Sequence, residues 1–402
     1  MKNIQPLIED ILPEITELRH DLHRHPELGY EEERTAAQVV AHLEKIPGMQ
    51  LQEGVAGTGI VALLAGDREG PCVALRADMD ALPIEEQGDV PYRSQTPGKM
   101  HACGHDGHTS CLVGAARVLG ECVDELQGPV KFLFQPAEEG GAGGKRMCEE
   151  GVLKNPDVAA IYALHGGPRC NVGQILLRTG VALASADEFE IEVEGRGGHA
   201  AFPHLGTDTV LIAAQIVVAL QSIVARNIDP LDSAVVTVGQ ISAGTASNII
   251  PQMAMLKGTV RTLSEETRQK TIERVKDVTA LTAQAFGGRA EAVFGENGYP
   301  PLINDARARA VVEAIVNEAL SGDIEPLEQL QPIMGAEDFA FYSQRVPAFN
   351  FSLGLRADSS DNYPLLHQPD FDFNDAALPY GIKMHVEIAR RFVGEWQGGA
   401  AI

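Results

Sequence analysis

The sequence predicts an α/β protein: a helix-flanked, mostly parallel twisted sheet with a smaller α+β domain inserted into it. Three observations support this fold class. The chain has 402 residues, which is too many for one ordinary hydrophobic core. The first 180 residues alternate helical stretches with nearly continuous apolar runs, as expected of strands covered on both faces. From about residue 184 the runs alternate apolar and charged residues, as expected of strands with one solvent-exposed face.

The first part of the chain contains short apolar runs, bounded by Gly and Pro, that predict the strands of the main sheet. These runs lie at residues 58–64, 72–77, 130–135, 159–164 and 174–178. Helical stretches separate them, among them residues 109–120 and 144–150. Strands that alternate with helices in this way are typical of a sheet with helices packed on its faces.

The middle of the chain begins with DEFEIEVE at residues 187–194, in which Phe189, Ile191 and Val193 alternate with glutamates. The strand, helix, strand, strand, helix, strand order that follows matches a ferredoxin-like layer. Its later elements are predicted at residues 208–226, 234–241, 253–262, 265–286 and 289–294. We expect both helices on one face of this sheet and the glutamates on the other.

After residue 299 the pattern of the first part returns, with a helix at 305–321, an apolar strand at 349–355 and a final helix at 376–395. We therefore predict one domain made of residues 1–183 and 299–402. The inserted domain spans residues 184–298.

Composition excludes several classes of partner. A formal charge of −24 and a pI near 4.8 leave no basic surface for nucleic acid or for an anionic membrane. We predict that the apolar stretches are too short to span a bilayer. Acidic residues interrupt the N-terminal helix where a signal peptide needs an apolar core. Six cysteines without paired spacing indicate reduced thiols, so we expect a cytoplasmic protein.

Polar residues follow three of the predicted strands. Asp78 and Asp80 come just past one strand, Glu138 and Glu139 just past another, and His165 ends a third. Ligand sites in open α/β sheets lie outside the carboxyl ends of the strands. We therefore expect these side chains to share one site.

The densest polar cluster is MHACGHDGH at residues 100–108. In an extended segment His101, Cys103 and His105 point to one side. Thiolate and imidazole are typical ligands of zinc and similar divalent metals. The alternative is a loop that is merely rich in histidine, but the nearby carboxylates favour a metal site.

The adjacent pair Glu138 and Glu139 suggests two different roles. One carboxylate binds metal while its neighbour acts as a general base. The alternative is a solvated surface pair. The following GGAGG disfavours that alternative, because so many glycines weaken a plain helix face.

Seven motifs then identify a resemblance. They are MHACGHDGHT, PAEEGGAGG, GRGGHAAFPH, SNIIP, GTVRT, MGAEDFAFY and LLHQPDFDF, in this order. The chain resembles the metal-dependent aminoacylase/carboxypeptidase family, in its hippurate hydrolase and indole-acetyl-amino-acid hydrolase branch. The resemblance covers nearly the whole chain.

The resemblance implies a di-metal catalytic domain with an inserted lid and dimerisation domain. It implies two divalent metal ions per subunit. The donor types favour zinc or manganese and are also compatible with cobalt or nickel. The implied metal ligands are Cys103, His105, Glu139, His165 and His367. It also implies a homodimer formed through the lid.

The resemblance implies Glu138 as the general base that acts on a metal-bridging water. His199 is implied as a donor to the tetrahedral intermediate, in relatives often from the other subunit. Asn248 and Arg261 match positions that contact substrate, with Arg261 pairing with its carboxylate. For Asp78 we expect a role in orienting a ligand.

The expected reaction is hydrolysis of a linear amide bond in N-acyl amino acids, which gives a carboxylic acid and a free amino acid. A dipeptidase and an N-acetyl-diamino-acid deacetylase are alternatives within the family. A non-catalytic binding protein on the same fold is the alternative from another class.

The remaining histidine and acidic clusters are expected to be structural or, for His101, His108 and the pair Glu337 and Asp338, to support the site from behind the ligands. They are His101 and His108 beside the metal motif, His20, His23 and His25 near the N-terminus, His204 in the lid, and the pair Glu337 and Asp338.

Overall fold

The computed structural model describes residues 1–357 and 362–398. The chain divides into two compact units. The first comprises Met1–Gly180, Ile303–Leu330 and Asp338–Ile402, and the second Val181–Leu302 and Gln331–Glu337. Two of the points at which the chain passes from one unit to the other lie after Gly180 and after Leu302. Residues 331–337 were expected in the main domain but belong to the second unit, because the backbone of Ile333 bonds to Ala182 and Ala184.

Within the described residues, eight strands form the sheet of the first unit, in the order β1-β2-β4-β3-β5-β16-β6-β15. The central strands β4, β3, β5 and β16 run parallel to one another, and β15 runs parallel to β6. The pairs β1/β2, β2/β4 and β16/β6 are antiparallel, so the sheet is mixed rather than mostly parallel. The strands are β1 (Gln50–Val55), β2 (Gly59–Leu64), β3 (Cys72–Asp78), β4 (Val130–Gln135), β5 (Val158–Asn171), β6 (Gln174–Leu177), β15 (Glu325–Glu328) and β16 (Ala348–Arg356).

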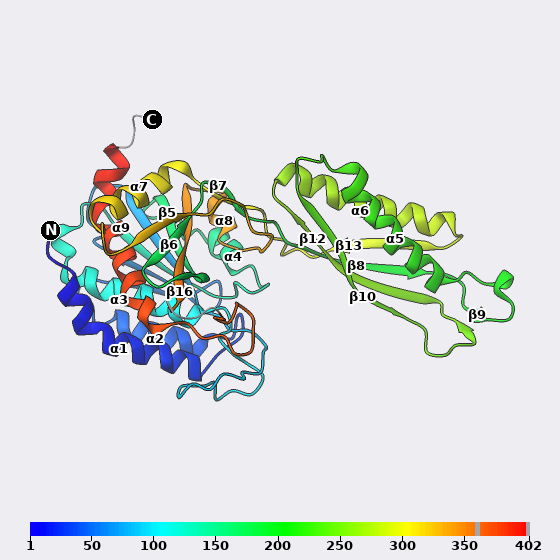
Figure 1. Cartoon of the computed structure of the whole chain (residues 1–402), viewed down its shortest axis with the longest axis horizontal. Coiled ribbons are helices and arrows are strands. Elements are labelled where there is room, and N and C mark those ends of the chain that lie inside the picture. The colour runs from blue at the N-terminus through cyan, green and yellow to red at the C-terminus, as the bar shows by residue number, and fades with distance from the viewer. Residues whose placement is uncertain (358–361, 399–402) are drawn as a thin grey trace. The chain divides into compact units, whose positions relative to one another are not determined.

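Helices flank this sheet, as the sequence predicted (Figure 1). α3 and α9 contact each other and β3, and α1 packs on both of these helices. The strands β3 and β4 are buried along their whole length, which explains their unbroken apolar runs. The helices of this unit are α1 (Gln5–Arg24), α2 (Glu33–Leu43), α3 (His105–Glu121), η1 (Val123–Glu125), α4 (Gly143–Glu149), α7 (Ala306–Glu318), α8 (Ala340–Ser343), η3 (Asp375–Ala377) and α9 (Leu378–Gly398).

The second unit is built on an antiparallel sheet in the order β10-β12-β8-β13, with α5 and α6 packed together on one face (Figure 1). This is the ferredoxin-like arrangement that the sequence predicted. Phe189, Ile191 and Val193 fill the core beneath the helices, while the glutamates of β8 are exposed. The elements are β8 (Asp187–Glu194), α5 (Thr209–Asn227), β10 (Ala234–Ala243), β12 (Met253–Thr262), α6 (Glu265–Ala285) and β13 (Arg289–Phe294).

Short elements complete the structure. β9 (Gly198–His199) pairs with β11 (Ile249–Ile250), and β7 (Gly180–Leu183) pairs with β14 (Leu302–Asn304). The segment Pro203–Leu205 forms the 3-10 turn η2.

One helix among the described residues, α5, is long and apolar enough to cross a membrane by length and composition alone. The expectation that every apolar stretch is too short was therefore wrong for this segment. Its inner residues Ile212, Ile216, Leu220 and Ile223 lie in the core of the second unit. That packing accounts for the apolar residues on its inner face, while Val210, Leu211, Val218 and Val224 on its outer face are exposed.

Candidate active site

Three neighbouring parallel strands bring the predicted polar residues to one edge of the first unit's sheet. Asp78 is the last residue of β3, and Glu138 and Glu139 follow β4. His165 lies inside β5 rather than at its end, because this strand continues to Asn171. Since β4, β3 and β5 are adjacent, the three segments meet as the sequence predicted.

The segment from Cys103 to His105 is not extended, contrary to expectation. Gly104 adopts a left-handed conformation with φ of 86°, and α3 begins at His105. A side chain at residue 104 is disfavoured by this φ, and its Cβ would lie 3.1 Å from the ring of Phe373. The turn at this glycine separates Cys103 from α3, and His101 is not among the ligand groups formed by the described residues.

The structure gathers the proposed ligands and the proposed base into overlapping groups. Cys103, His105 and His165 present ligand atoms within 4.8 Å of one another, and so do Cys103, Glu139 and His367. Glu138 joins a third group with His105 and Glu139. The Sγ of Cys103 lies 3.5 Å from Nε2 of His165, and Nε2 of His367 lies 3.1 Å from Oε1 of Glu139.

Hydrogen bonds decide which histidines have a lone pair to offer. Nδ1 of His165 faces the carbonyl oxygen of Gly166 at 3.0 Å and so carries the proton, which leaves Nε2 unprotonated toward Cys103. Nδ1 of His105 faces a carboxylate oxygen of Asp80 at 3.1 Å. Nε2 of His105 is buried and has no hydrogen-bond partner among the described residues.

His108 lies beside this cluster but has both ring nitrogens occupied. Its Nδ1 bonds to Asp78 at 2.7 Å, and its Nε2 accepts the backbone N–H of Gly166 at 2.8 Å. It therefore connects β3 to β5 and offers no free lone pair. This agrees with the structural role expected of it.

Asp80 contacts two proposed ligands, in addition to Asp78, for which an orienting role is expected. One carboxylate oxygen of Asp80 bonds to His105, and the other accepts the backbone N–H of Glu139 at 2.9 Å. Asp78 contacts His108 and lies 3.7 Å from Nε2 of His105. The signal for Asp80 was present in the sequence, because both aspartates follow the same strand, two residues apart.

A buried network positions Glu138. Its Oε1 accepts the backbone N–H of Asp338 at 3.2 Å. The carboxylate of Asp338 is bound by Arg76 at 2.9 Å and by the backbone N–H of Gly144 at 2.7 Å. Arg76 also donates to Asp78 at 2.7 Å. The predicted supporting role of Asp338 agrees with these contacts, whereas Arg76, which lies inside an apolar strand, was missed.

The electrostatics of the cluster differ from residue to residue. Burial raises the pKa of the Cys103 thiol well above its usual range, and Glu139 and Glu138 raise this pKa further. Burial alone would lower the pKa of His105, but Asp78 and Asp80 outweigh burial and raise it to about 10. Burial lowers the pKa of His165 to about 3. Cys103 and His105 must therefore each lose a proton before they act as ligands.

The donor set fits divalent cations. It combines a thiol, imidazole nitrogens and a carboxylate, the ligand types of zinc and related transition metals. Nε2 of His105 is buried and makes no hydrogen bond among the described residues, and a bound cation would satisfy it, since buried polar atoms are normally satisfied. The carboxylate behind His105 is the usual partner of a metal-binding histidine.

The second unit carries the remaining predicted residues. His199 and Asn248 are brought together, because β9 pairs with β11 and the backbone N–H of Ala200 donates to the carbonyl oxygen of Asn248 at 3.0 Å. Nδ1 of His199 accepts the backbone N–H of Ala201 at 3.0 Å, so its Nε2 carries the proton. Arg261 lies on β12 and donates to the carbonyl oxygen of Met334 at 3.4 Å.

The N-terminal histidines are structural, as expected. Nδ1 of His23 lies 2.8 Å from Asp106, Nε2 of His20 lies 2.7 Å from Asp375, and His25 bonds to the backbone of Asp21. His101 is buried, and burial lowers its pKa to about 3. His204 lies in the exposed turn η2.

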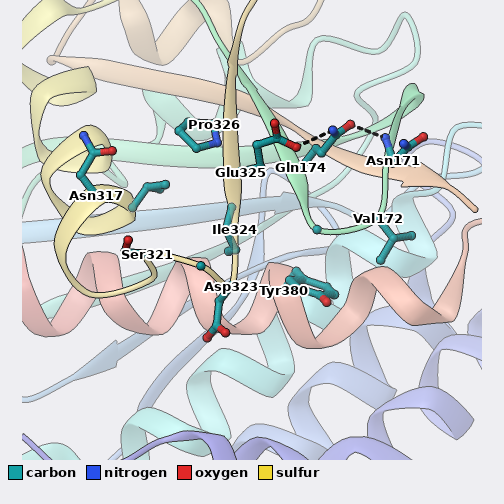
Figure 2. Close-up of a pocket in the computed structure, with 13 residues that line it drawn as sticks. Asn171, Val172, Gln174, Asn317, Ser321, Asp323, Ile324, Glu325, Pro326 and Tyr380 are labelled. Carbon is teal, nitrogen blue, oxygen red and sulfur yellow. Dashed lines mark hydrogen bonds between the residues drawn. The ribbon is translucent and has the colours of Figure 1, made fainter. Parts of the chain in front are cut away.

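A pocket of about 520 Å³ lies elsewhere in the first unit, between the β5–β6 turn and the start of α9 (Figure 2). Its lining includes Asn171, Gln174 and Glu325, which hydrogen-bond to one another, together with Asp323 and Tyr380. It contains no thiol or imidazole among its described lining residues. The metal-type cluster, rather than this pocket, is therefore the candidate site.

Thiol, imidazole and paired carboxylate groups collected at the strand ends of an α/β sheet are typical of metal-dependent hydrolases. The family model of Peptidase family M20/M25/M40 matches residues 74–391. The chain belongs to this family. The family, the α/β fold class and the assignment as a hydrolase are thereby confirmed.

Individual relatives cover nearly the whole chain. IAA-amino acid hydrolase ILR1-like 4 of Arabidopsis thaliana is 41% identical over 94% of this chain and 85% of its own length. N-acetyl-L-cysteine deacetylase of Bacillus subtilis is 41% identical over 94% of this chain and 87% of its own length. Among solved structures, the YXEP protein of Bacillus subtilis, described as a dinuclear metal-binding peptidase of the M20 family, has a TM-score of 0.80 at 33% identity. That match covers 96% of this chain and 99% of the other.

Proposed function

We propose that this protein is a metal-dependent amidohydrolase that cleaves N-acyl amino acids to a carboxylic acid and a free amino acid. The observation that carries the proposal is the convergence of Cys103, His105, Glu139, His165 and His367 around Glu138. Two relatives with 41% identity are named for hydrolysis of an amino acid conjugate and for deacetylation of N-acetyl-L-cysteine. The bond that we expect to be cleaved is a linear amide, which is not part of a ring.

Two groups of ligand atoms, both of which include Cys103, would hold the two cations. One group is Cys103, His105 and His165, and the other is Cys103, Glu139 and His367. Bound divalent cations supply Lewis acidity, which polarises a carbonyl and makes water a stronger acid. The mixed donors suit zinc or manganese, and also cobalt or nickel.

Glu138 is the general base in this proposal. It takes a proton from the attacking water and returns that proton to the leaving amine. The backbone N–H of Asp338 fixes one of its oxygens, and Arg76 fixes Asp338. Such a fixed carboxylate suits proton transfer, because its orientation is set before substrate binds.

The second unit supplies groups for substrate in the same proposal. His199 has its proton on Nε2 and so is prepared to donate a hydrogen bond to the oxyanion of the tetrahedral intermediate. Arg261 offers a planar fork suited to the carboxylate of the amino acid product. Asn248, which precedes β11 and accepts the backbone N–H of Ala200, provides an amide for substrate binding.

A homodimer through the second unit is part of the proposal. β10 is an edge strand of its sheet, and unpaired strand edges are common sites of association. The outer face of α5, which contacts β10, is apolar and exposed at Val210, Leu211, Val218 and Val224. A partner copy that covers this face explains why a helix of a water-exposed unit is apolar on both sides. The free state of all six cysteines supports a cytoplasmic location.

The test replaces Glu138 with glutamine, which keeps the shape and removes the base. We expect Glu138→Gln to retain metal by elemental analysis and to lose roughly 100- to 10,000-fold in kcat on N-acetyl and N-benzoyl amino acids. Glu149→Gln, on the exposed face of α4, is the matched control and should keep full activity. Full activity in Glu138→Gln would overturn the mechanism.

A substrate panel separates the alternatives. Turnover of dipeptides or of N-acetyl diamino acids in preference to other acyl amino acids would favour the dipeptidase or the diamino-acid deacetylase. Absence of turnover in metal-loaded protein, with binding retained, would favour a non-catalytic binding protein.

A further inference from the structure

Arg19 is one of the largest fully buried side chains in the described part of the chain. It lies on α1, outside every segment that carries a proposed ligand. A buried guanidinium is costly unless several acceptors compensate its charge. Its acceptors come from two segments that are distant from it in sequence, and each of these segments adjoins a proposed metal ligand.

The first of these segments is the opening turn of α3. Nε of Arg19 donates to Oδ2 of Asp106 at 2.9 Å, and Nδ1 of His23 contacts the same oxygen at 2.8 Å. Asp106 directly follows His105 in the helix. Two side chains of α1 therefore hold the turn from which His105 extends.

The second segment carries His367. Arg19 donates through Nη2 to Oδ1 of Asp372 and through Nη1 to Oδ1 of Asp375, the latter at 3.3 Å. The other oxygen of Asp372 accepts the hydroxyl of Tyr92 at 2.7 Å. The guanidinium also lies 4.6 Å from the centre of the Tyr92 ring.

His367 depends on this segment for its position. It is 51% exposed at its side chain, and its backbone has a φ of 64° in the left-handed region. Its backbone N–H donates to the carbonyl oxygen of Ala102 at 2.8 Å, next to Cys103. Little packing surrounds the ring itself, so the flanking residues must set its distance from Cys103 and Glu139.

We propose that Arg19 is a positioning residue of the metal site, which fixes the His367 segment against the opening turn of α3. This inference rests on the proposed function, because it presumes that the gathered side chains bind cations. One guanidinium bridges Asp106, Asp372 and Asp375. It thereby fixes the distance between the segment that carries His105 and the segment that carries His367. Without it, the three carboxylates repel one another and the His367 segment loses one of the contacts that hold it against α1 and α3.

The proposal predicts that the two cations respond differently. The group of Cys103, Glu139 and His367 contains the residue that Arg19 positions from a distance. The group of Cys103, His105 and His165 is also held by Asp80 and by the backbone of β5. Loss of Arg19 should therefore weaken the first group more than the second.

The experiment strips the full-length protein with a chelator and titrates it with Zn²⁺ in a calorimeter. Arg19→Lys keeps the charge but cannot reach three carboxylates with one ammonium. We expect wild type to bind two Zn²⁺ per chain, and Arg19→Lys to bind one of them about 10- to 100-fold more weakly. Asp372→Asn, at a partly exposed partner, should weaken the same cation with less risk to folding.

Arg390→Lys is the matched control. Arg390 is also buried and also bridges carboxylates, those of Glu125 and Glu387, but it contacts no proposed ligand among the described residues. It should retain both Zn²⁺ affinities, with circular dichroism reporting the fold of every variant. Wild-type affinity for both cations in Arg19→Lys and Asp372→Asn, or equal weakening in Arg390→Lys, would overturn the role of Arg19. A wild-type chain that binds no Zn²⁺ would instead overturn the proposed metal site.

Discussion

At the scale of single residues, hydrogen bonds separate histidines that the sequence presents as one cluster. His105 and His165 each have one nitrogen fixed by an acceptor and the other turned toward Cys103 or left unpaired. His108 has both nitrogens occupied. The number of free lone pairs, rather than the spacing of the histidines, therefore distinguishes a candidate ligand from a structural residue.

This distinction can be tested with the same substitution at two neighbouring positions. We expect His105→Gln to lower metal content by elemental analysis, because it removes a donor. His108→Gln should keep the metal and lower the thermal midpoint, because it breaks the bonds to Asp78 and Gly166. Loss of metal in His108→Gln with full metal in His105→Gln would contradict the assignment.

His23 predicts a pH dependence of stability. Burial alone would lower its pKa, but Asp106 and Glu86 outweigh burial and the opposing charge of Arg19, and raise the pKa to about 9 from 6.5. The folded state therefore binds the proton more tightly than the unfolded state. The resulting stabilisation is fully present below pH 6.5 and is lost as pH rises through about 9.

The stability advantage of wild type over His23→Gln should therefore shrink by roughly 3 kcal/mol between these two pH values. The measurement is urea unfolding of wild type and variant across this range. Asn317→Gln, an exposed substitution on α7 that removes no ionisable group, is the control and should show a difference that does not change with pH. A constant difference for His23→Gln would refute the charged state of His23.

At the scale of elements, the opening of α3 is packed against the His367 segment with no spare room. The Cβ of an alanine at residue 107 would lie 2.4 Å from the ring of Phe373, which is fully buried. Gly394 of α9, in contrast, has no heavy atom within 4 Å of such a Cβ among the described residues. The two glycines thus differ in packing alone, since both lie within helices.

We expect Gly107→Ala to destabilise the protein by about 1–3 kcal/mol, because the Phe373 ring must move. Gly394→Ala should be stabilising by roughly 0.5–1 kcal/mol, because alanine favours a helix over glycine. Chemical unfolding of both variants measures these values. A neutral Gly107→Ala would show that the α3 contact is loose.

The two helices of the second unit provide a matched test of the proposed dimer. Val218 on α5 and Leu281 on α6 are 66% and 61% exposed. If α5 and the β10 edge form the interface, Val218→Lys should shift the protein from dimer to monomer, while Leu281→Lys should leave the dimer intact. Sedimentation velocity distinguishes these outcomes, and an unchanged dimer in Val218→Lys would exclude this face.

At the scale of the whole molecule, the acidic excess and the two-unit construction have separate consequences. A charge of −24 does not attract a carboxylate substrate, so local positive groups must hold it. All proposed ligands lie in the first unit. Cations that bind only the folded first unit stabilise that unit alone, by roughly 4 kcal/mol at a free concentration of about 1,000 times Kd.

Removal of metal by a chelator should therefore act unevenly along the chain. We expect faster hydrogen exchange in peptides of β3, β4 and β5 and unchanged exchange in peptides of β8 and β12. Mass spectrometry of exchanged, digested protein makes this comparison. A uniform increase over both units would contradict the assignment of the cations to the first unit.

The sequence by itself determined the fold class, the insertion and most elements to within a few residues. It could do so because the spacing of apolar residues shows whether a strand or helix is buried on one face or on both. Strand β4 and the ferredoxin-like order of the second unit are examples. The sequence also identified which groups offer metal chemistry, because donor residue types follow strands that are adjacent in the sheet.

Only the tertiary structure decided how those groups are held. It placed Asp80 against both His105 and Glu139, ended the extended run at Gly104, and revealed the bridges made by Arg19 and Arg76. Each of these depends on hydrogen bonds between segments that are distant in sequence, or on a single backbone angle at a turn. Neither is encoded in local periodicity, because such contacts exist only after the sheet and helices have packed.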